Sequence, residues 1–172
     1  MPAISISMAV SAMAAQSVGA SLHDRVDRVT RAGLAACFVS TMALTLLLLA
    51  LNEPLLGLFL GKGSSAIAIG AHIQYLAIWS WPIMSLMLCL IGTMRAYGVA
   101  FLPLIIMVIA HYPARIGFYE LFRPALGADA LWLSYPISSA VALVLTWLAF
   151  NRPGWRRDQL PAHIAEPVEQ PA

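Results

Sequence analysis

The sequence is poor in charged side chains: 10 Lys and Arg and 8 Asp and Glu make up only 10% of its 172 residues. Soluble domains have about 25% charged residues, so a soluble protein of this size would lack the polar groups to cover its surface. Apolar residues account for 60% of the chain, and the mean hydropathy is +0.80. These values exclude a soluble globule, a disordered chain and a coiled coil, and they predict an all-α integral membrane protein.

Several functional motifs are also missing from the sequence. It contains no CxxC, no HExxH and no glycine-rich phosphate loop, which would indicate metal, protease or nucleotide chemistry. No basic run interleaved with aromatic residues is present, so we expect no nucleic-acid partner. The two cysteines, Cys37 and Cys89, lie in apolar runs and are expected to be small buried side chains. The sequence thus gives no indication of an enzyme.

Long runs without acidic or basic side chains predict five membrane-crossing helices, since crossing a bilayer takes about 20 apolar residues. We expect one helical bundle over 1–151 and a disordered cytoplasmic tail over 152–172, which is polar and contains several prolines. Residues 52–65 contain Pro54 and are expected to continue the second helix along the membrane interface. The predicted helices cover 3–22, 33–52, 67–95, 100–121 and 130–150.

The basic residues predict the orientation of these helices, because cytoplasmic loops are enriched in Lys and Arg. Seven of them fall in loops on one side of the bundle and two on the other. We therefore expect a multi-pass protein of the cell (inner or plasma) membrane, with its N-terminus outside and its C-terminus in the cytoplasm. The first group is Arg25, Arg28, Arg31, Arg95, Arg152, Arg156 and Arg157, and the second is Lys62 and Arg123.

Small residues recur at every fourth position of 3–22, at Ser7, Ser11, Ala15 and Gly19. Small side chains at this spacing let membrane helices approach closely, so they predict a packing face. Gln16 lies beside this stripe and either hydrogen-bonds to another helix or lines a cavity.

The segment 67–95 combines polar and aromatic side chains. At 100° per residue, a continuous helix would place Gln74, Trp81 and Ser85 on one face, and His72, Tyr75 and Trp79 on another. Pro82 is expected to bend the helix in its middle, because proline removes one backbone hydrogen bond. This pattern suits either the lining of a cavity or a packed core helix with aromatic residues near its outer end.

Three further polar residues lie within predicted membrane helices: His72, His111 and Arg115. An arginine at this depth is expected to face protein or water rather than lipid. Its role stays open between contact with an anionic group and a structural one. The two histidines leave a b-type haem subunit as an alternative, and a small scaffold or accessory subunit is another. No Asp or Glu lies in the middle of any predicted span.

Three segments of the sequence resemble parts of the multidrug and toxic compound extrusion (MATE) transporters. They correspond to the end of a helix with its basic loop, to an Arg-Gly-x-Gly turn followed by proline, and to the start of a helix. Ser17, Ala96 and Ala130 depart from the family pattern. The matching residues are Gln16, Gly19, Ala20, Arg25, Arg28 and Gly33 in the first segment, Arg95, Gly98 and Pro103 in the second, and Gly127 and Trp132 in the third.

The resemblance implies a twelve-helix antiporter fold with two six-helix lobes, of which this chain would form the last five helices. Such proteins export organic, often cationic, compounds in exchange for Na⁺ or H⁺. The resemblance further implies that the N-terminal lobe and the coupling carboxylates lie outside this chain, which would be inactive alone. The implied substrate-cavity residues are Gln16, Gln74, Tyr75, Trp79, Trp81 and Ser85.

Overall fold

The computed structural model describes residues 2–61 and 66–152, and its regular elements there are all helices. The predicted tail therefore lies outside the described residues, apart from Arg152, and so does Lys62. The described residues form eight helices: α1 (Pro2–Gly19), α2 (His23–Ala50), α3 (Asn52–Leu60), α4 (Ala66–Ala77), α5 (Ser80–Ala96), α6 (Phe101–His111), α7 (Pro113–Leu126) and α8 (Asp129–Asn151).

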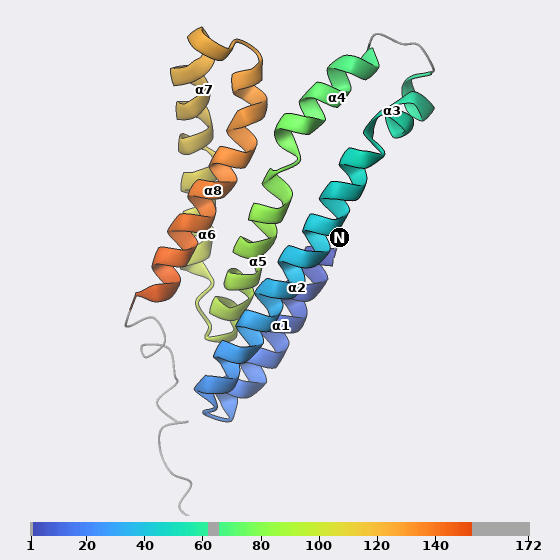
Figure 1. Cartoon of the computed structure of the whole chain (residues 1–172). Coiled ribbons are helices and arrows are strands. Elements are labelled where there is room, and N and C mark those ends of the chain that lie inside the picture. The colour runs from blue at the N-terminus through green and yellow to red at the C-terminus, as the bar shows by residue number, and fades with distance from the viewer. Residues whose placement is uncertain (1, 62–65, 153–172) are drawn as a thin grey trace, which may run out of the picture.

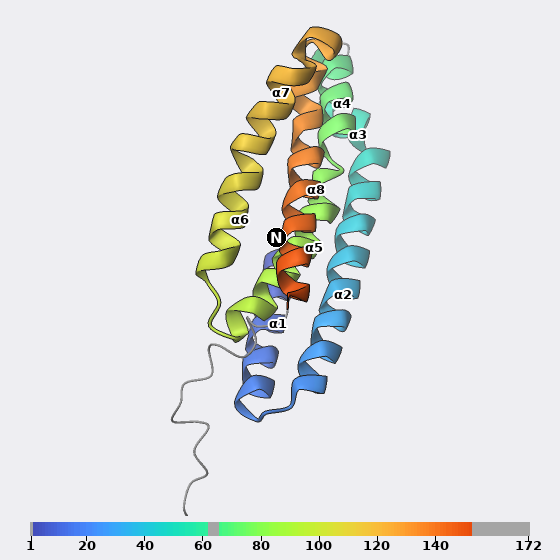
Figure 2. The same cartoon turned by 90° about the vertical axis from the view of Figure 1, so that its left-hand side faces the viewer.

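The helices form an elongated bundle of roughly antiparallel rods with α5 in its interior (Figure 1, Figure 2). Helix α5 packs against α1, α2 and α8, and α8 also contacts α4, α6 and α7. The α1–α2 turn, the α5–α6 turn and the end of α8 lie at the lower end of Figure 1, whereas α3, the beginning of α4 and the α7–α8 turn lie at the upper end. The described arginines of the predicted cytoplasmic loops are therefore all at one end of the bundle.

Four helical segments of the described chain are long and apolar enough to cross a membrane: His23–Ala50, Ala66–Ala96, Phe101–Leu126 and Asp129–Asn151. Large apolar side chains such as Val39 and Leu121 are exposed on the outside of the bundle, as expected of a surface that faces lipid. The predicted all-α membrane fold is thus confirmed. The first predicted span is present as α1, which has only 18 residues and is not one of the four.

The first turn of the chain is shorter than predicted. Helix α2 begins at His23 rather than at residue 33, so the expected basic loop is helical. The connection is closed by two hydrogen bonds, from Leu22 N–H to the Ser17 carbonyl and from Ser21 N–H to the Val18 carbonyl. This is the Schellman arrangement that ends many helices. Because residues 23–31 contain no Gly or Pro, the helix starts directly after it.

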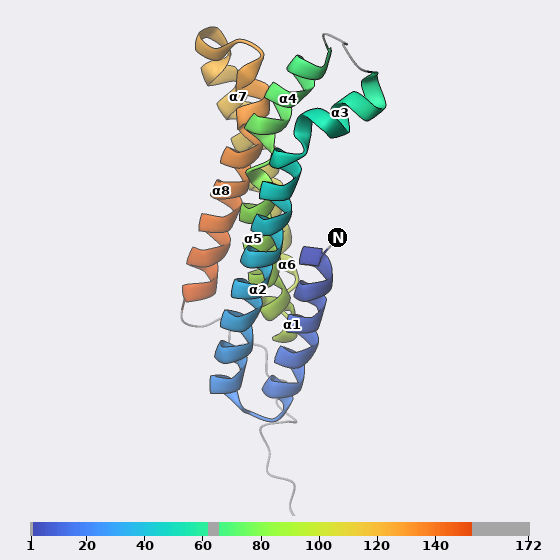
Figure 3. The ribbon, with the colours of Figure 1, turned by 45° about the vertical axis from the view of Figure 1, so that its right-hand side comes forward.

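Three of the rods are interrupted, and a proline follows each interruption within three residues. Pro54 is the third residue of α3, Pro82 the third of α5 and Pro113 the first of α7. Proline tolerates the first turn of a helix because the N–H groups there need no helical partner. The chain after Pro54 is helical as predicted, but α3 turns away from the direction of α2 (Figure 3).

Helices α1, α2 and α5 pack closely because small side chains lie between them. A Cβ atom on Gly92 of α5 would lie 2.7 Å from the Ser7 carbonyl oxygen of α1, and one on Gly33 of α2 would clash with Val10. The buried face of α1 consists of Ser7, Val10, Ala14 and Ser17. The predicted stripe is therefore wrong beyond Ser7, since Ala15 and Gly19 are exposed. A strict four-residue spacing drifts by about 40° per step around a helix, whereas alternating steps of three and four stay on one face.

Candidate substrate cavity

A cavity of 290 Å³ lies between the beginning of α1, the middle of α2 and the first half of α5. Its wall is mostly apolar, and its polar side chains are Thr41, Trp81 and Ser85. A site of this size and composition suits a small, largely apolar ligand. The lining residues are Pro2, Ala3, Ile4, Thr41, Leu44, Trp81, Met84, Ser85 and Leu88.

The break between α4 and α5 positions Trp81 on this cavity. Pro82 cannot donate a hydrogen bond to the Ile78 carbonyl four residues earlier, and that carbonyl accepts the N–H of Trp81 at 3.1 Å instead. The chain therefore makes a tight turn at Ile78–Trp79 before α5 begins. Trp81 follows this turn with 53% of its surface exposed, so its ring is available to a ligand.

A buried pair of hydroxyl groups lies in the cavity wall. Thr41 of α2 and Ser85 of α5 approach to 3.0 Å between their oxygen atoms. The Ser85 hydroxyl also lies 2.7 Å from the carbonyl of Pro82, and the Thr41 hydroxyl lies within hydrogen-bonding distance of the carbonyl of Cys37. Because each hydroxyl has one proton, one of the two donates to a carbonyl of its own helix while the other donates across the contact between α2 and α5. Each hydroxyl oxygen keeps acceptor capacity, which a ligand that donates hydrogen bonds can use.

The structure places the six predicted cavity residues in different surroundings. Trp81 and Ser85 line the cavity. Gln74 is half-buried, and Tyr75 and Trp79 are exposed at the end of α4 and in the following turn. Gln16 is exposed on α1. None of these other four lines the cavity.

Helix α2 contributes to this wall, which was not predicted from the sequence. The buried face of α2 consists of Val26, Thr30, Gly33, Cys37, Thr41 and Thr45. These are mostly small residues spaced by three and four, a pattern that predicts a tightly packed helix face. The same pattern would have identified Thr41.

The intramembrane histidines are both engaged within the protein. His72 Nε2 lies 3.2 Å from the Asp129 carboxylate, an exposed pair that joins α4 to the start of α8. His111 Nδ1 lies 3.1 Å from the Met107 carbonyl, one turn earlier in α6. Among the described residues, no group of three or more His, Cys, Asp or Glu side chains is placed to hold a metal ion.

Arg115 faces α8 rather than lipid. Its guanidinium carbon lies 3.9 Å from the centre of the Tyr135 ring, and its Nη2 donates to the Ser138 hydroxyl at 3.3 Å. Stacking on an aromatic ring and one hydrogen bond partly replace the hydration that the charge loses. Of the two roles that the sequence leaves open for Arg115, these contacts support the structural one, in which it joins α7 to α8.

Two glycines of the family pattern follow the ends of helices. Gly98 has a φ of +80°, and α5 closes with hydrogen bonds from Gly98 N–H to the Arg95 carbonyl and from Val99 N–H to the Met94 carbonyl. Gly127 has a φ of +57° after α7. Both positions favour glycine because other residues are strained at positive φ.

The remaining pattern residues have more varied positions. Gly19 and Ala20 are exposed, and the positive φ near them falls on Ser21. Pro103 is buried as the third residue of α6. Trp132 stacks against Tyr135 with ring centres 6.3 Å apart. Arg95 lies exposed in the last turn of α5, where a positive charge interacts favourably with the helix dipole.

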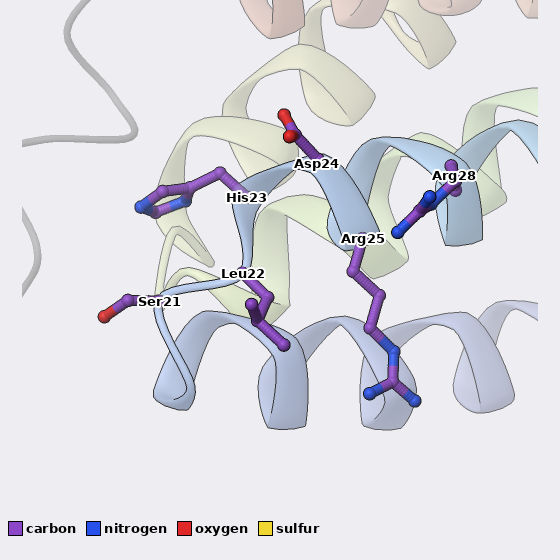
Figure 4. A pocket seen from close by; sticks show the side chains of 6 residues that line it. All are labelled: Ser21, Leu22, His23, Asp24, Arg25 and Arg28. Carbon is purple, nitrogen blue, oxygen red and sulfur yellow. The ribbon is translucent and has the colours of Figure 1, made fainter.

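A second pocket, of 360 Å³, lies at the α1–α2 turn and contains Arg25 and Arg28 (Figure 4). The figure shows that Arg25 and Asp24 point in opposite directions and that His23 points away from both. These side chains do not converge on one point, so they do not form a binding site for a single ligand group.

The chain is similar to known proteins in two comparisons. The family model MatE matches residues 1–119. The chain is 28% identical over 162 residues to a protein of Bacillus subtilis (strain 168) named "Probable multidrug resistance protein YoeA". That alignment covers 93% of this chain but 35% of the Bacillus protein, so the chain spans about a third of its relative's length. No solved structure matched the chain.

Proposed function

The chain belongs to the MatE family, that of the multidrug and toxic compound extrusion transporters, and on this premise we propose that its helices form part of the wall of a multidrug efflux transporter. The observation that carries the proposal is the cavity between α1, α2 and α5, with Trp81 at its edge. The multidrug resistance protein to which the chain is similar supports the same activity.

The proposed substrate is a small organic cation with apolar groups. The exposed face of Trp81 attracts a cation through its ring electrons, an interaction worth about 0.5–2 kcal/mol depending on desolvation. Leu44, Met84 and Leu88 contact the apolar part of the ligand. The Thr41–Ser85 hydroxyl pair accepts a hydrogen bond from an ammonium or amide N–H.

Further helices, in the same protein or in a second chain, complete this cavity in the proposal. Trp81, Leu44 and Ile4 line the cavity and are all substantially exposed. In a transporter such a wall faces an opposing group of helices, and the two move against each other around the ligand. No acidic residue lies in the middle of a predicted span, so the carboxylate that binds Na⁺ or H⁺ is supplied by the opposing helices.

The arginine-rich end of the bundle faces the cytoplasm in this proposal, because Arg25, Arg28 and Arg31 at the beginning of α2 and Arg95 in the last turn of α5 lie at that end. The cavity then opens between helices at the middle of the membrane. Fusion of a reporter enzyme to residue 172 tests this orientation. A reporter that is active only in the cytoplasm should be active there.

Binding of a fluorescent organic cation such as ethidium to the purified chain in lipid nanodiscs tests the site. Trp81→Ala should weaken binding about three- to tenfold, since a cation–π contact and apolar area are lost. Trp79→Ala is the matched control, because Trp79 is also exposed and does not line the cavity. Equal binding by both variants would contradict the proposed site.

A second experiment tests whether further helices are required. Residues 1–172 alone, expressed in a host that lacks its own multidrug pumps, should not lower ethidium accumulation. Efflux by this chain alone would show that it transports without an opposing lobe.

A further inference from the structure

A third pocket, of 270 Å³, lies at the arginine-rich end of the bundle between α2 and α8. Both helices pack on α5, which contributes the buried side chain of Leu90 to the pocket. The beginning of α2 and the end of α8 lie toward the same end of the bundle, the lower one in Figure 1. The pocket is separate from the substrate cavity, with which it shares no lining residue.

The pocket combines one acid, one base and neutral polar groups. Asp27 and Arg31 lie one turn apart on α2, and Trp147 and Asn151 face them from α8. Arg31, Trp147 and Asn151 are exposed, and Asp27 is half-buried. Leu34, Leu90 and Phe150 provide apolar surface between them. A ligand that fits carries a positive and a negative group close together, next to an apolar portion.

We propose that this pocket binds the headgroup of a phospholipid that carries a primary ammonium, as phosphatidylethanolamine does. The lipid phosphate accepts hydrogen bonds from the Arg31 guanidinium and the Asn151 amide, as phosphates commonly do from arginine. The ammonium donates to the Asp27 carboxylate. A two-carbon linker joins the two groups of the headgroup, which matches a base and an acid separated by about one helical turn.

The location of the pocket supports a lipid as the ligand. It opens between two helices at the end of the membrane-crossing segments, where interfacial tryptophans and arginines meet lipid headgroups. The apolar side chains of the pocket receive the first carbons of the acyl chains. A carboxylate offers about four acceptor positions, so Asp27 can bind an ammonium in addition to its contact within the protein.

The charges of Asp27 and Arg31 favour this headgroup over those of other common phospholipids. A purely anionic headgroup such as phosphatidylglycerol would place its negative charge beside Asp27 without an ammonium to compensate. The trimethylammonium of phosphatidylcholine has no N–H to donate to Asp27. It is recognised instead by cages of several aromatic rings, whereas Trp147 is the one exposed aromatic side chain that lines this pocket.

Native mass spectrometry of the full chain tests the proposal. The protein is extracted from nanodiscs with equal amounts of phosphatidylethanolamine, phosphatidylcholine and phosphatidylglycerol of identical acyl chains, and the retained lipid is identified. We expect phosphatidylethanolamine to exceed each of the others about tenfold, the ratio expected for one additional charge-assisted hydrogen bond. Equal retention of the three lipids, or an excess of either of the others, would overturn the proposal.

Four variants locate the binding site. Asp27→Asn should bring the ratio of phosphatidylethanolamine to phosphatidylcholine close to one, and Arg31→Gln should lower the retention of both. Asp24→Asn and Arg28→Gln are the matched controls, because these residues lie on the same end of α2 but line the pocket at the α1–α2 turn. Control variants that change the ratio as much as Asp27→Asn would show that general surface charge causes the preference.

A fluorescence measurement gives a second readout on the native chain. Phosphatidylethanolamine with bromine atoms near its headgroup should quench Trp147, measured as the difference between the native chain and Trp147→Phe. Brominated phosphatidylcholine at the same concentration should quench this component less. Equal quenching by the two lipids would contradict the selectivity. The result is independent of whether the substrate cavity binds an organic cation.

Discussion

The hydroxyl groups of Thr41 and Ser85 lie 3.0 Å apart in the buried contact between α2 and α5, and both line the cavity beside Trp81. The same pair therefore joins two helices and provides the polar part of the proposed site. This relationship lets stability and ligand binding be tested on the same residues.

The Thr41–Ser85 contact should be measurable as a coupling energy. A double-mutant cycle of Thr41→Val and Ser85→Ala should give about 0.5–1.5 kcal/mol between the two sites, measured by reversible unfolding in sodium dodecyl sulfate. Ser40→Ala is the control, because Ser40 bonds only to carbonyls of its own helix. No coupling between the two sites would mean that the hydroxyls do not interact.

Gly92→Ala should destabilise the bundle by about 1–3 kcal/mol, because the added methyl group would lie 2.7 Å from the Ser7 carbonyl oxygen and 2.9 Å from the Ser7 hydroxyl. Gly117→Ala should be neutral or slightly stabilising, since nothing lies within 4 Å of its added methyl group and alanine favours a helix. The thermal unfolding of the two variants in the same detergent gives the comparison. Similar losses in both would contradict the close approach of α1 to α5.

Glycine at position 21 should stabilise the α1–α2 turn. Ser21 has a φ of +57°, which costs a residue with a side chain about 1–2 kcal/mol. Ser21→Gly should therefore raise the unfolding temperature, whereas Ser21→Val should lower it. An unchanged or lower unfolding temperature for Ser21→Gly would show that the turn has a different backbone conformation.

Pro82 should be responsible for the interruption between α4 and α5. Pro82→Ala restores an N–H that can bond to the Ile78 carbonyl, so we expect the two helices to join into a straighter one. Distances between spin labels at residues 69 and 95, measured by pulsed electron paramagnetic resonance, should lengthen. Pro136→Ala is the comparison, because Pro136 lies within α8, which continues past it. In Pro136→Ala, the distance between spin labels at residues 131 and 148 should change less.

The membrane-crossing segments could be predicted from the sequence because long apolar runs have few other uses. The composition of the cavity could not be predicted in the same way. A continuous helix of 100° per residue places Gln74 on the face of Trp81, but the turn at Ile78–Trp79 resets that rotation. Gln74, Tyr75 and Trp79 precede α5 and do not line the cavity, and neither does Gln16, which is exposed on α1. Thr41, Leu44 and Met84 line it instead.

The start of α2 shows a similar limit. Three arginines and two aspartates at 23–31 indicated a loop, because charges usually mark the ends of membrane spans. In the structure these charged residues lie within α2, because the segment contains no Gly or Pro and the turn that ends α1 is completed before it. Hydropathy predicts where a helix enters lipid, and not where the helix begins.

The most direct test of the proposed site is the fluorescence of Trp81 in a chain whose other tryptophans are replaced by phenylalanine. If the cavity between α1, α2 and α5 binds organic cations, adding ethidium to this variant in nanodiscs should quench the emission with saturation. Leu44→Trp, in a chain whose other tryptophans except Trp81 are replaced, adds a second reporter in the same cavity wall and should be quenched at the same ligand concentration. Emission of Trp81 that stays unchanged while ethidium binds to the protein would contradict the account.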